Sequence, residues 1–366
     1  MASSLASFGK LLFGISEKAP ESVIGIDFGS SSIKVVELKR ENDMAVLQTY
    51  GELQLGPYAT LDVGRATNLG TGRLTEALGD IMREAAVVSR SAGVAMPYAA
   101  SFVAVIRLPT KDTNALPAMI PIEARKYVPV PVAQVTLDWF VIPEKKGQEA
   151  AASATRVLLA AIHNEALNKF RMVIEQGKID SSFNEIEIFS TIRSSVPNQA
   201  DTVMIIDIGA ATTKLYIVSD GIVQATHSIN AGGQDLTSSL SKSLEIPFKD
   251  AEEMKREVGL TSVDNPRIER ALSFPLERIF MESKRVLDGY ERETSVTSVS
   301  SIVLSGGGAT MKGLEEYVEQ TLGRRIVRAN PFSKIMYPAF LESTLYEIGP
   351  SFAVALGVAL RRLEEG

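Results

Sequence analysis

The stretch that decides the fold is IGIDFGSSSIKVVEL at residues 24–38, because MIIDIGAATTKLYIV at residues 204–218 repeats its pattern. Each copy has an apolar segment, an Asp-x-Gly turn with small residues, and a second apolar segment, which predicts a β-hairpin. Four residues of the first copy recur at the same spacing in the second, as Ile26 and Ile206, Asp27 and Asp207, Gly29 and Gly209, and Lys34 and Lys214. The repeat predicts two structurally related lobes.

Strands and helices alternate along both halves of the chain, which predicts α/β lobes with mixed sheets. From the hydrophobic patterns we expect helices over 74–88, 120–127, 165–175, 312–322 and 352–363, and strands over 101–108, 135–142, 156–162 and 301–304. The stretch 145–155 has the composition of a loop. A largely helical section runs from about 250 to 292, and we expect Pro266 and Pro275 to break it.

The composition is that of a globular protein long enough for two lobes. The chain has 366 residues, of which 45% are apolar and 22% charged, whereas single cores stop growing at roughly 250 to 300 residues. The net charge of -6 is spread without a long run of one sign, so the basic stripe that nucleic-acid binding needs is not expected. The absence of cysteine excludes disulfides and thiolate metal sites.

Apolar stretches are short compared with the roughly 18 to 20 residues that a membrane-spanning helix needs. The most apolar of them, around 352–360, is far shorter, so no transmembrane segment is expected. Near the N-terminus, Leu5, Phe8, Leu12 and Ile15 have near-helical spacing. This segment is compatible with a short helix that docks on a partner or a membrane, and equally with an unstructured extension.

The two Asp-x-Gly turns carry residue types that bind polyphosphate. Free backbone N–H groups and hydroxyls can surround phosphate oxygens, and a carboxylate can hold a hydrated Mg²⁺. The candidates in the first turn are Asp27, Gly29, Ser30, Ser31, Ser32 and Lys34; those in the second are Asp207, Gly209, Ala210, Thr212 and Thr213. Asp27 and Asp207 are the candidate metal ligands. One such turn alone is weak evidence, because Asp and Gly occur in most tight turns.

A triple-glycine loop strengthens the prediction of a nucleotide site. Gly306, Gly307 and Gly308, followed by Ala309, come directly after an apolar strand and shortly before a helix. Without side chains, their backbone can approach a flat or anionic ligand. The chain contains neither G-x-x-x-x-G-K-[ST] nor G-x-G-x-x-G, so neither a P-loop nor a dinucleotide fingerprint competes.

Together, the two turns and the loop 305–309 resemble the phosphate and adenosine motifs of the actin-like ATPases. This resemblance implies ATP with Mg²⁺ as the ligand. The segment DAEEMKREVG at 250–259 is similar to the helix that contacts ribose and adenine in that superfamily, which implies contacts from Glu252, Lys255 and Arg256. From the residues alone, Glu252 and Arg256 at i, i+4 are equally an exposed helix ion pair.

Within the superfamily, the chain resembles the PilM family over roughly 23–363. The resemblance rests on 24–38, on IEARKYVPVP at 122–131 with LDW at 137–139, and on the helix at 350–361. It implies an actin-like fold of duplicated ribonuclease H-like lobes with an FtsA-like inserted subdomain. It also implies a cytoplasmic component of the type IV pilus platform, held at the inner membrane by the N-terminal peptide of a PilN-type protein. Other platform or motor proteins are further candidate partners.

The implied domain boundaries follow the repeat. We expect an N-terminal extension at 1–19, a first lobe at 20–200 with the inserted subdomain at about 98–165, a second lobe at 201–345 with a helical subdomain at about 241–299, and a C-terminal helix at 346–366 that returns to the first lobe. The groove beside the inserted subdomain is the expected peptide site.

Hydrolysis is a separate question. The resemblance implies that Glu187 positions the attacking water, with Glu185 as the competing choice and an exposed carboxylate at a strand end as the structural alternative for both. Ala210, Ala211 and Lys214 depart from the pattern of bacterial actins, so at most slow turnover is expected. Two other functions stay open, a filament-forming FtsA-like protein and a small-molecule kinase. A kinase needs a base for the substrate hydroxyl, and only Glu185 and Glu187 are candidates.

Overall fold

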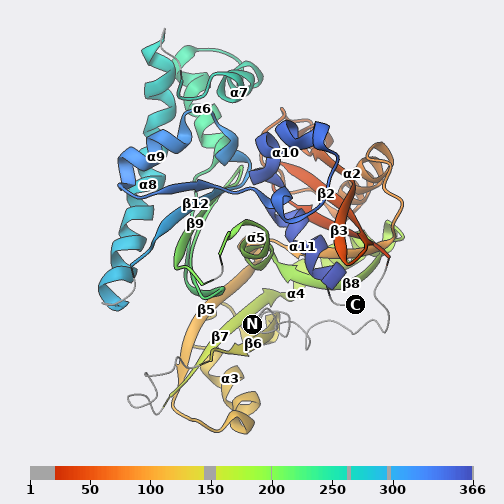
Figure 1. Cartoon of the computed structure of the whole chain (residues 1–366), viewed down its shortest axis with the longest axis vertical. Coiled ribbons are helices and arrows are strands. Elements are labelled where there is room, and N and C mark those ends of the chain that lie inside the picture. The colour runs from red at the N-terminus through yellow and green to blue at the C-terminus, as the bar shows by residue number, and fades with distance from the viewer. Residues whose placement is uncertain (1–20, 144–153, 199, 262–264, 295–297, 365–366) are drawn as a thin grey trace.

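Two five-stranded sheets of the same topology form the body of the molecule (Figure 1). The computed structural model describes residues 21–143, 154–198, 200–261, 265–294 and 298–364. The N-terminal extension, for which a docking helix and an unstructured segment were both compatible with the sequence, and most of the expected loop at 145–155 lie outside these residues.

The first sheet has the strand order β3-β2-β1-β4-β8. Its strands are β1 (Ser22–Phe28), β2 (Ser32–Glu41), β3 (Met44–Gln54), β4 (Ser91–Met96) and β8 (Asp180–Ile186). Strands β1, β2 and β3 form an antiparallel meander, and β4 and β8 run parallel to β1. Strand β1 is almost continuously apolar and is buried from Val23 to Phe28, as a central strand covered on both faces should be.

The second sheet repeats this arrangement in the order β11-β10-β9-β12-β13. Its strands are β9 (Val203–Ile208), β10 (Thr213–Ser219), β11 (Ile222–Ile229), β12 (Ser301–Ser305) and β13 (Ile326–Arg328). The two hairpins share their register, because Asp27 lies opposite Lys34 and Asp207 lies opposite Lys214. The duplication predicted from the sequence repeat is therefore confirmed.

A third sheet is inserted in the chain between β4 and β8 of the first sheet. It has the order β5-β7-β6, with β5 (Ser101–Leu108), β7 (Thr155–His163) and β6 (Val135–Val141). Helix α3 (Leu116–Ala124) packs on it, and their buried apolar side chains form a separate core that includes Ile106, Leu116 and Leu159. In Figure 1 this unit projects below the two larger sheets.

The α-helices of the two lobes pack on the larger sheets or on neighbouring helical segments. They are α2 (Thr71–Glu84), α4 (Asn164–Gln176), α5 (Glu187–Ser195), α6 (Gly233–Leu244), α7 (Phe248–Glu257), α8 (Pro266–Thr294), α9 (Leu314–Leu322), α10 (Glu342–Ile348) and α11 (Ala353–Glu364). In α2, Leu74, Leu78 and Ile81 recur at helical spacing and are buried. Helix α11 packs on β1 and β2 of the first sheet.

Proline affects the helices differently from the prediction. Pro266 is the first residue of α8, but Pro275 lies inside this helix and does not end it. A proline in a helix interior costs about 3 kcal/mol. Around it α8 buries Leu272, Leu276 and Phe280, and burying a large apolar side chain contributes about 1.5–3 kcal/mol each. Packing therefore outweighs the local penalty.

Two helix boundaries also differ from the prediction. The helix expected to reach Val88 ends at Glu84, and Val88 is 82% exposed. Because Val88 is exposed, it adds nothing to the buried face of the helix. The apolar pattern in the sequence therefore extends beyond the last residue of α2. Helix α3 begins at Leu116, four residues before the expected start, because its first turn also packs in the core of the inserted unit.

One helical run among the described residues, Ala339–Glu364, is long and apolar enough to cross a membrane. It is longer than the apolar stretch around 352–360 that was expected from the sequence. Of the most apolar 18-residue stretch in this run, 67% is buried inside the protein. The C-terminal part of the run packs on the first sheet. The buried core helix of a globular protein can have the same length and apolar composition, so these two properties are weak evidence for a membrane span.

Candidate functional site

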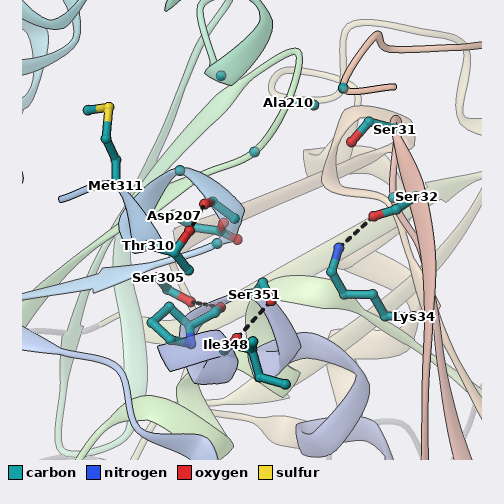
Figure 2. A pocket seen from close by; sticks show the side chains of 18 of the residues that line it. Ser31, Ser32, Lys34, Asp207, Ala210, Ser305, Thr310, Met311, Ile348 and Ser351 are labelled. Carbon is teal, nitrogen blue, oxygen red and sulfur yellow. Dashed lines mark hydrogen bonds between the residues drawn. The ribbon is translucent and has the colours of Figure 1, made fainter. Parts of the chain in front are cut away.

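The two hairpin turns face each other across a cleft of about 830 Å³ between the two larger sheets. This volume is within the range of small-molecule sites, roughly 300 to 1,000 Å³. Most predicted site residues line it: Asp27, Gly29, Ser30, Ser31, Ser32 and Lys34 of the first hairpin, Asp207, Gly209, Ala210 and Thr212 of the second, Glu187 of α5, Glu252, Lys255 and Arg256 of α7, and Gly306, Gly307 and Gly308 after β12. Lys214, which was not among the predicted site residues, lines it as well. Figure 2 shows Ser31 and Ser32 opposite Asp207 and Thr310.

Two predicted residues lie behind this surface. Thr213 is fully buried, and its hydroxyl donates to the carbonyl of Ala231 at 2.8 Å. Ala309 is also fully buried and packs in the core of the second lobe. Their side chains stabilise the walls of the cleft and do not line it.

The two turns have the same tight geometry. A Cβ added at Gly29 would lie 2.9 Å from the carbonyl oxygen of Ser32, and one added at Gly209 would lie 2.9 Å from that of Thr212. Gly306 has φ +82, and a Cβ there would lie 2.4 Å from a carboxylate oxygen of Asp207. The chain thus keeps side chains away from three places where its backbone borders the cleft, and backbone N–H groups at such turns are suited to phosphate oxygens.

A buried charge network lies beneath the second turn. The Lys214 ammonium contacts Asp207 at 3.1 Å and Glu187 at 2.6 Å. Burial opposes the charge on Lys214, but Asp207 and Glu187 raise its pKa above the usual value. Glu187 also accepts a hydrogen bond from the backbone N–H of Tyr98 at 2.6 Å. Glu187 is therefore held at the cleft by a lysine and by the segment that leads into the inserted sheet.

The first turn carries the other candidate metal ligand. Burial raises the pKa of Asp27 to about 7, although Lys34 and Lys214 act in the opposite direction. Lys34 donates to the Ser32 hydroxyl at 2.7 Å and contacts Glu52 at 3.3 Å.

The donor set fits Mg²⁺ only as part of a phosphate complex. Among the described residues there is no group of three or more His, Cys, Asp or Glu side chains that could hold a metal ion. Mg²⁺ commonly keeps several waters and is bound through one or two carboxylates and the phosphates of a substrate. Asp27 and Asp207 match this mode, in which the protein does not enclose the ion.

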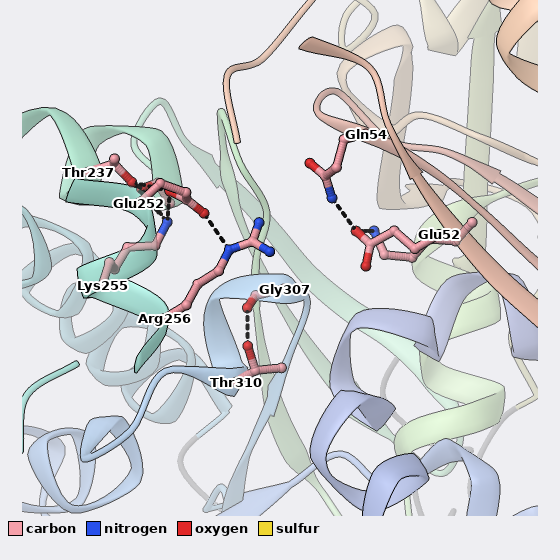
Figure 3. Close-up of polar contacts among 10 residues, drawn as sticks. Glu52, Gln54, Thr237, Glu252, Lys255, Arg256, Gly307 and Thr310 are labelled. Atoms are coloured by element: carbon pink, nitrogen blue, oxygen red, sulfur yellow. Dashed lines mark hydrogen bonds and ion pairs between the residues drawn. The ribbon is translucent and has the colours of Figure 1, made fainter. Parts of the chain in front are cut away.

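Helix α7 forms the far end of the cleft. Glu252 is buried and accepts hydrogen bonds from Thr237 at 2.5 Å, Lys255 at 2.6 Å and Arg256 at 2.8 Å (Figure 3). Burial pushes the pKa of Glu252 upward, but Lys255 and these hydrogen bonds bring it below its usual value. The ion pair expected between Glu252 and Arg256 is present, but Glu252 is buried and not exposed.

Sequence reasoning missed the residues that come from β3 and the loop after it. Glu52 and Gln54 line the cleft opposite α7 (Figure 3). Glu52 lies opposite Lys34 in the pairing of β2 with β3. This pairing with a predicted site residue was the signal that could have identified Glu52 as part of the site. Gly64 also lines the cleft, where a Cβ would lie 2.7 Å from the carboxyl carbon of Glu252.

The same loop joins the two lobes at the mouth of the cleft. The guanidinium of Arg65 lies 3.8 Å from the ring centre of Phe248 in α7. The backbone N–H of Ala66 donates to Gln234 of α6 at 3.2 Å. These contacts had no signal in the sequence, because they join segments about 170 residues apart.

Glu185 has a structural position. It is 5% exposed, does not line the cleft, and accepts hydrogen bonds from Arg193 and Arg361 at 2.7 Å each. These arginines lower its pKa to about 2 against the effect of burial. Of the two candidates for positioning water, only Glu187 is at the cleft.

Comparisons with known proteins agree with this architecture. A model of the family described as type IV pilus assembly protein PilM matches residues 25–363. The cell division protein FtsA of Neisseria meningitidis serogroup B is 23% identical over 338 residues, which cover 81% of this chain and 80% of FtsA.

Two solved structures show the same fold. A chain of a PilM-PilN type IV pilus biogenesis complex superposes with a TM-score of 0.78 and 24% identity, covering 94% of this chain and 99% of that one. MreB5 of Spiroplasma citri bound to ADP gives a TM-score of 0.52 and 14% identity, covering 94% and 96%. The predicted actin-like fold is confirmed. Because the family model spans nearly the whole chain, this protein belongs to the family of type IV pilus assembly protein PilM.

Proposed function

We propose that the protein binds ATP with Mg²⁺ in the cleft and acts as a cytoplasmic component of the type IV pilus platform. The observation that carries the nucleotide assignment is the pair of matching turns at Gly29 and Gly209, which face one cleft beside a triple-glycine loop. The similarity to MreB5, whose solved structure contains ADP, supports it. The membership of the PilM family supports the role in pilus assembly.

Each wall of the cleft has a part in this proposal. The backbone of the two turns, with Ser30, Ser31 and Thr212, surrounds the phosphates. Asp27 and Asp207 hold the hydrated ion. The loop 306–308 and α7 contact the nucleoside, where Glu252 and Arg256 offer an acceptor and a donor. When bound, Mg²⁺ would neutralise phosphate charge beside the carboxylates.

Loss of either carboxylate tests the assignment. We expect Asp27→Ala and Asp207→Ala each to weaken Mg²⁺-dependent ATP binding about tenfold or more, because a charged hydrogen bond or ion contact contributes about 1.5–3 kcal/mol. Calorimetric titration with and without Mg²⁺ measures this, with Glu319→Ala on the exposed side of α9 as the control. Unchanged affinity in both aspartate variants would sink the assignment.

The base preference is a second expected outcome. We expect ATP to bind more tightly than GTP, since the resemblance of the loop 306–308 and of α7 is to adenosine motifs. A competition titration against a fluorescent ATP analogue gives both affinities. Tighter binding of GTP would count against this arrangement.

Binding is expected to dominate over turnover. A residue that positions water needs its carboxylate available to that water. Glu187 already contacts Lys214 and the N–H of Tyr98, both at 2.6 Å. We infer that hydrolysis is slow while these contacts hold. The kinase alternative also loses one of its two candidate bases, because Glu185 is enclosed by arginines.

The proposed partner is the cytoplasmic peptide of a PilN-type inner-membrane protein. Its proposed site is the groove beside the inserted sheet, near residues 122–139. Ile122 is 63% exposed and Tyr127 is 41% exposed on this unit, and β6 is an edge strand of the inserted sheet. An exposed edge with apolar neighbours suits an extended peptide. The match to a chain of a PilM-PilN complex supports this partner.

Truncation and a point variant separate the groove from the N-terminal segment as the attachment site. We expect a chain lacking residues 1–19 to retain the partner peptide in a pull-down, and Trp139→Ala to lose most of it. Val88→Ala, which removes an exposed apolar side chain outside the inserted unit, is the control. If truncation alone abolishes recruitment and Trp139→Ala has no effect, the contact lies elsewhere.

A further inference from the structure

The outer face of α8 carries a continuous stripe of exposed arginine and apolar side chains. With 3.6 residues per turn, eight exposed residues lie within about 40° of one line along the helix. They are Arg267, Arg270, Phe274, Arg278, Met281, Arg285, Asp288 and Arg292. We refer to them as the α8 stripe. Phe274 is 76% exposed and Met281 is 71% exposed, which places them among the most exposed large apolar side chains in the described parts of the chain.

The orientation of this stripe is fixed by the core. The opposite side of α8 buries Leu272, Leu276, Ile279, Phe280 and Leu287, each at most 2% exposed. Rotation that hid Phe274 would expose this buried set, so the stripe cannot turn inward. In Figure 1, α8 runs along the outer side of the second lobe. None of the stripe residues lines the nucleotide cleft.

Positive charge is concentrated along the stripe. The stripe contains five arginines and one acidic residue, although the chain as a whole has a net charge of -6. Acidic residues flank it: the exposed Glu277 borders it on one side, and Glu282 lies on the other, where it contacts Arg285 at 2.8 Å and His227 at 3.5 Å. Arg267 also donates to the carbonyl of Ser243. The stripe is thus a positive line on a negative protein, and its charge is complementary to an anionic surface.

We propose that the α8 stripe binds the anionic surface of a phospholipid bilayer, with α8 parallel to the membrane plane. Between Arg267 and Arg292 the helix is about 38 Å long, at 1.5 Å per residue. Phe274 and Met281, two turns apart, enter the headgroup region. The arginines beside them reach the lipid phosphates, a geometry that suits the planar guanidinium.

A partner helix fits this surface less well. Helix packing needs apolar side chains at three- and four-residue spacing along the seam. Here the positions before and after Phe274 on the seam are Arg270 and Arg278, and Arg285 follows Met281. Each arginine buried against a helix would need its own carboxylate. At a membrane surface the same side chains keep their charge at the phosphates while their apolar stems lie on the acyl boundary.

The test is co-sedimentation of the full chain with vesicles of phosphatidylcholine containing about a third phosphatidylglycerol. The salt concentration is roughly 0.1 M, where the Debye length is about 10 Å and charges at closer range still interact. Pure phosphatidylcholine vesicles are the lipid control. We expect binding only to the anionic vesicles. Arg270→Ala with Arg278→Ala, and separately Phe274→Ser with Met281→Ser, should each reduce it about tenfold or more.

Matched controls keep the test specific. Arg73→Ala with Arg171→Ala removes the same charge from exposed sites on α2 and α4, and Phe340→Ser removes an apolar side chain that is 82% exposed. Both should bind like the unmodified chain. All variants retain residues 1–19, and an unchanged melting temperature verifies folding.

Three outcomes would overturn the proposal. Equal binding by the stripe variants and the unmodified chain would place the membrane contact elsewhere, for example in residues 1–19. Failure of the full chain to bind anionic vesicles would exclude a lipid surface. If sedimentation without lipid shows self-association that the stripe variants abolish, the stripe is a contact between copies of this chain. None of these outcomes depends on nucleotide binding.

Discussion

Gly357→Ala is expected to lower the free energy of unfolding by about 3 kcal/mol, at the upper end of the cost of overpacking a core. Gly357 lies where α11 crosses α5, and a Cβ at this position would lie 2.0 Å from the carbonyl oxygen of Ser190. That oxygen belongs to the backbone of a packed helix, so it cannot move aside as a flexible side chain would. The helices must separate, and the contacts between α11 and β1 weaken with them.

Gly79→Ala is the matched control. Gly79 is exposed in the middle of α2, and a Cβ there would meet nothing within 4 Å. Alanine should raise stability by about 0.5–1 kcal/mol, since glycine in a helix interior carries that cost. Urea denaturation of the two variants and the unmodified chain measures the difference. If Gly357→Ala unfolds at the same urea concentration as the unmodified chain, the packing of α5 on α11 described above is wrong.

Glu185→Gln is expected to cost about 3–5 kcal/mol, the range found when one partner leaves a buried ion pair. Glu185 accepts from Arg193 at 2.7 and 2.8 Å and from Arg361 at 2.7 Å. The neutral amide would remove the carboxylate charge that both guanidinium groups contact. Glu175→Gln removes an exposed pair with Arg171 on α4, so it should change stability by less than about 1 kcal/mol.

The same contact predicts a dependence on acid. The pKa of Glu185 is about 2 in the folded protein, against an ordinary value of 4.5. A lowered pKa stabilises the folded state above the unfolded pKa, and this stabilisation is lost as the pH falls from 4.5 toward 2. Glu185→Gln should therefore flatten the loss of stability over that window, as followed by urea denaturation at several pH values. An equally steep loss in the variant would show that other carboxylates control acid unfolding.

Local sequence signals predicted the parts of the fold that depend on short segments. The Asp-x-Gly turns and their flanking apolar strands predicted both hairpins, because tight turns and strand periodicity are encoded within about ten residues. The repeat then predicted the second sheet from the first. The triple-glycine loop was predicted as part of the site for the same reason, since it directly follows the interior strand β12.

Features that depend on contacts between distant segments could not be predicted in this way. Pro275 has a strong local preference against a helix interior, but the burial of its neighbours decides the outcome. Glu185 and Glu187 are two residues apart and looked alike in sequence. Only the positions of Arg193, Arg361 and Lys214 show that one is structural and the other lies at the cleft.

A crystal structure of the full chain determined with ATP and Mg²⁺ tests the proposed nucleotide site most directly. We expect the phosphates between the turns that contain Gly29 and Gly209, the ion near Asp27 and Asp207, and adenine against the loop 306–308. Nucleotide bound at another place, or none in the cleft at a saturating concentration, would contradict the proposed site.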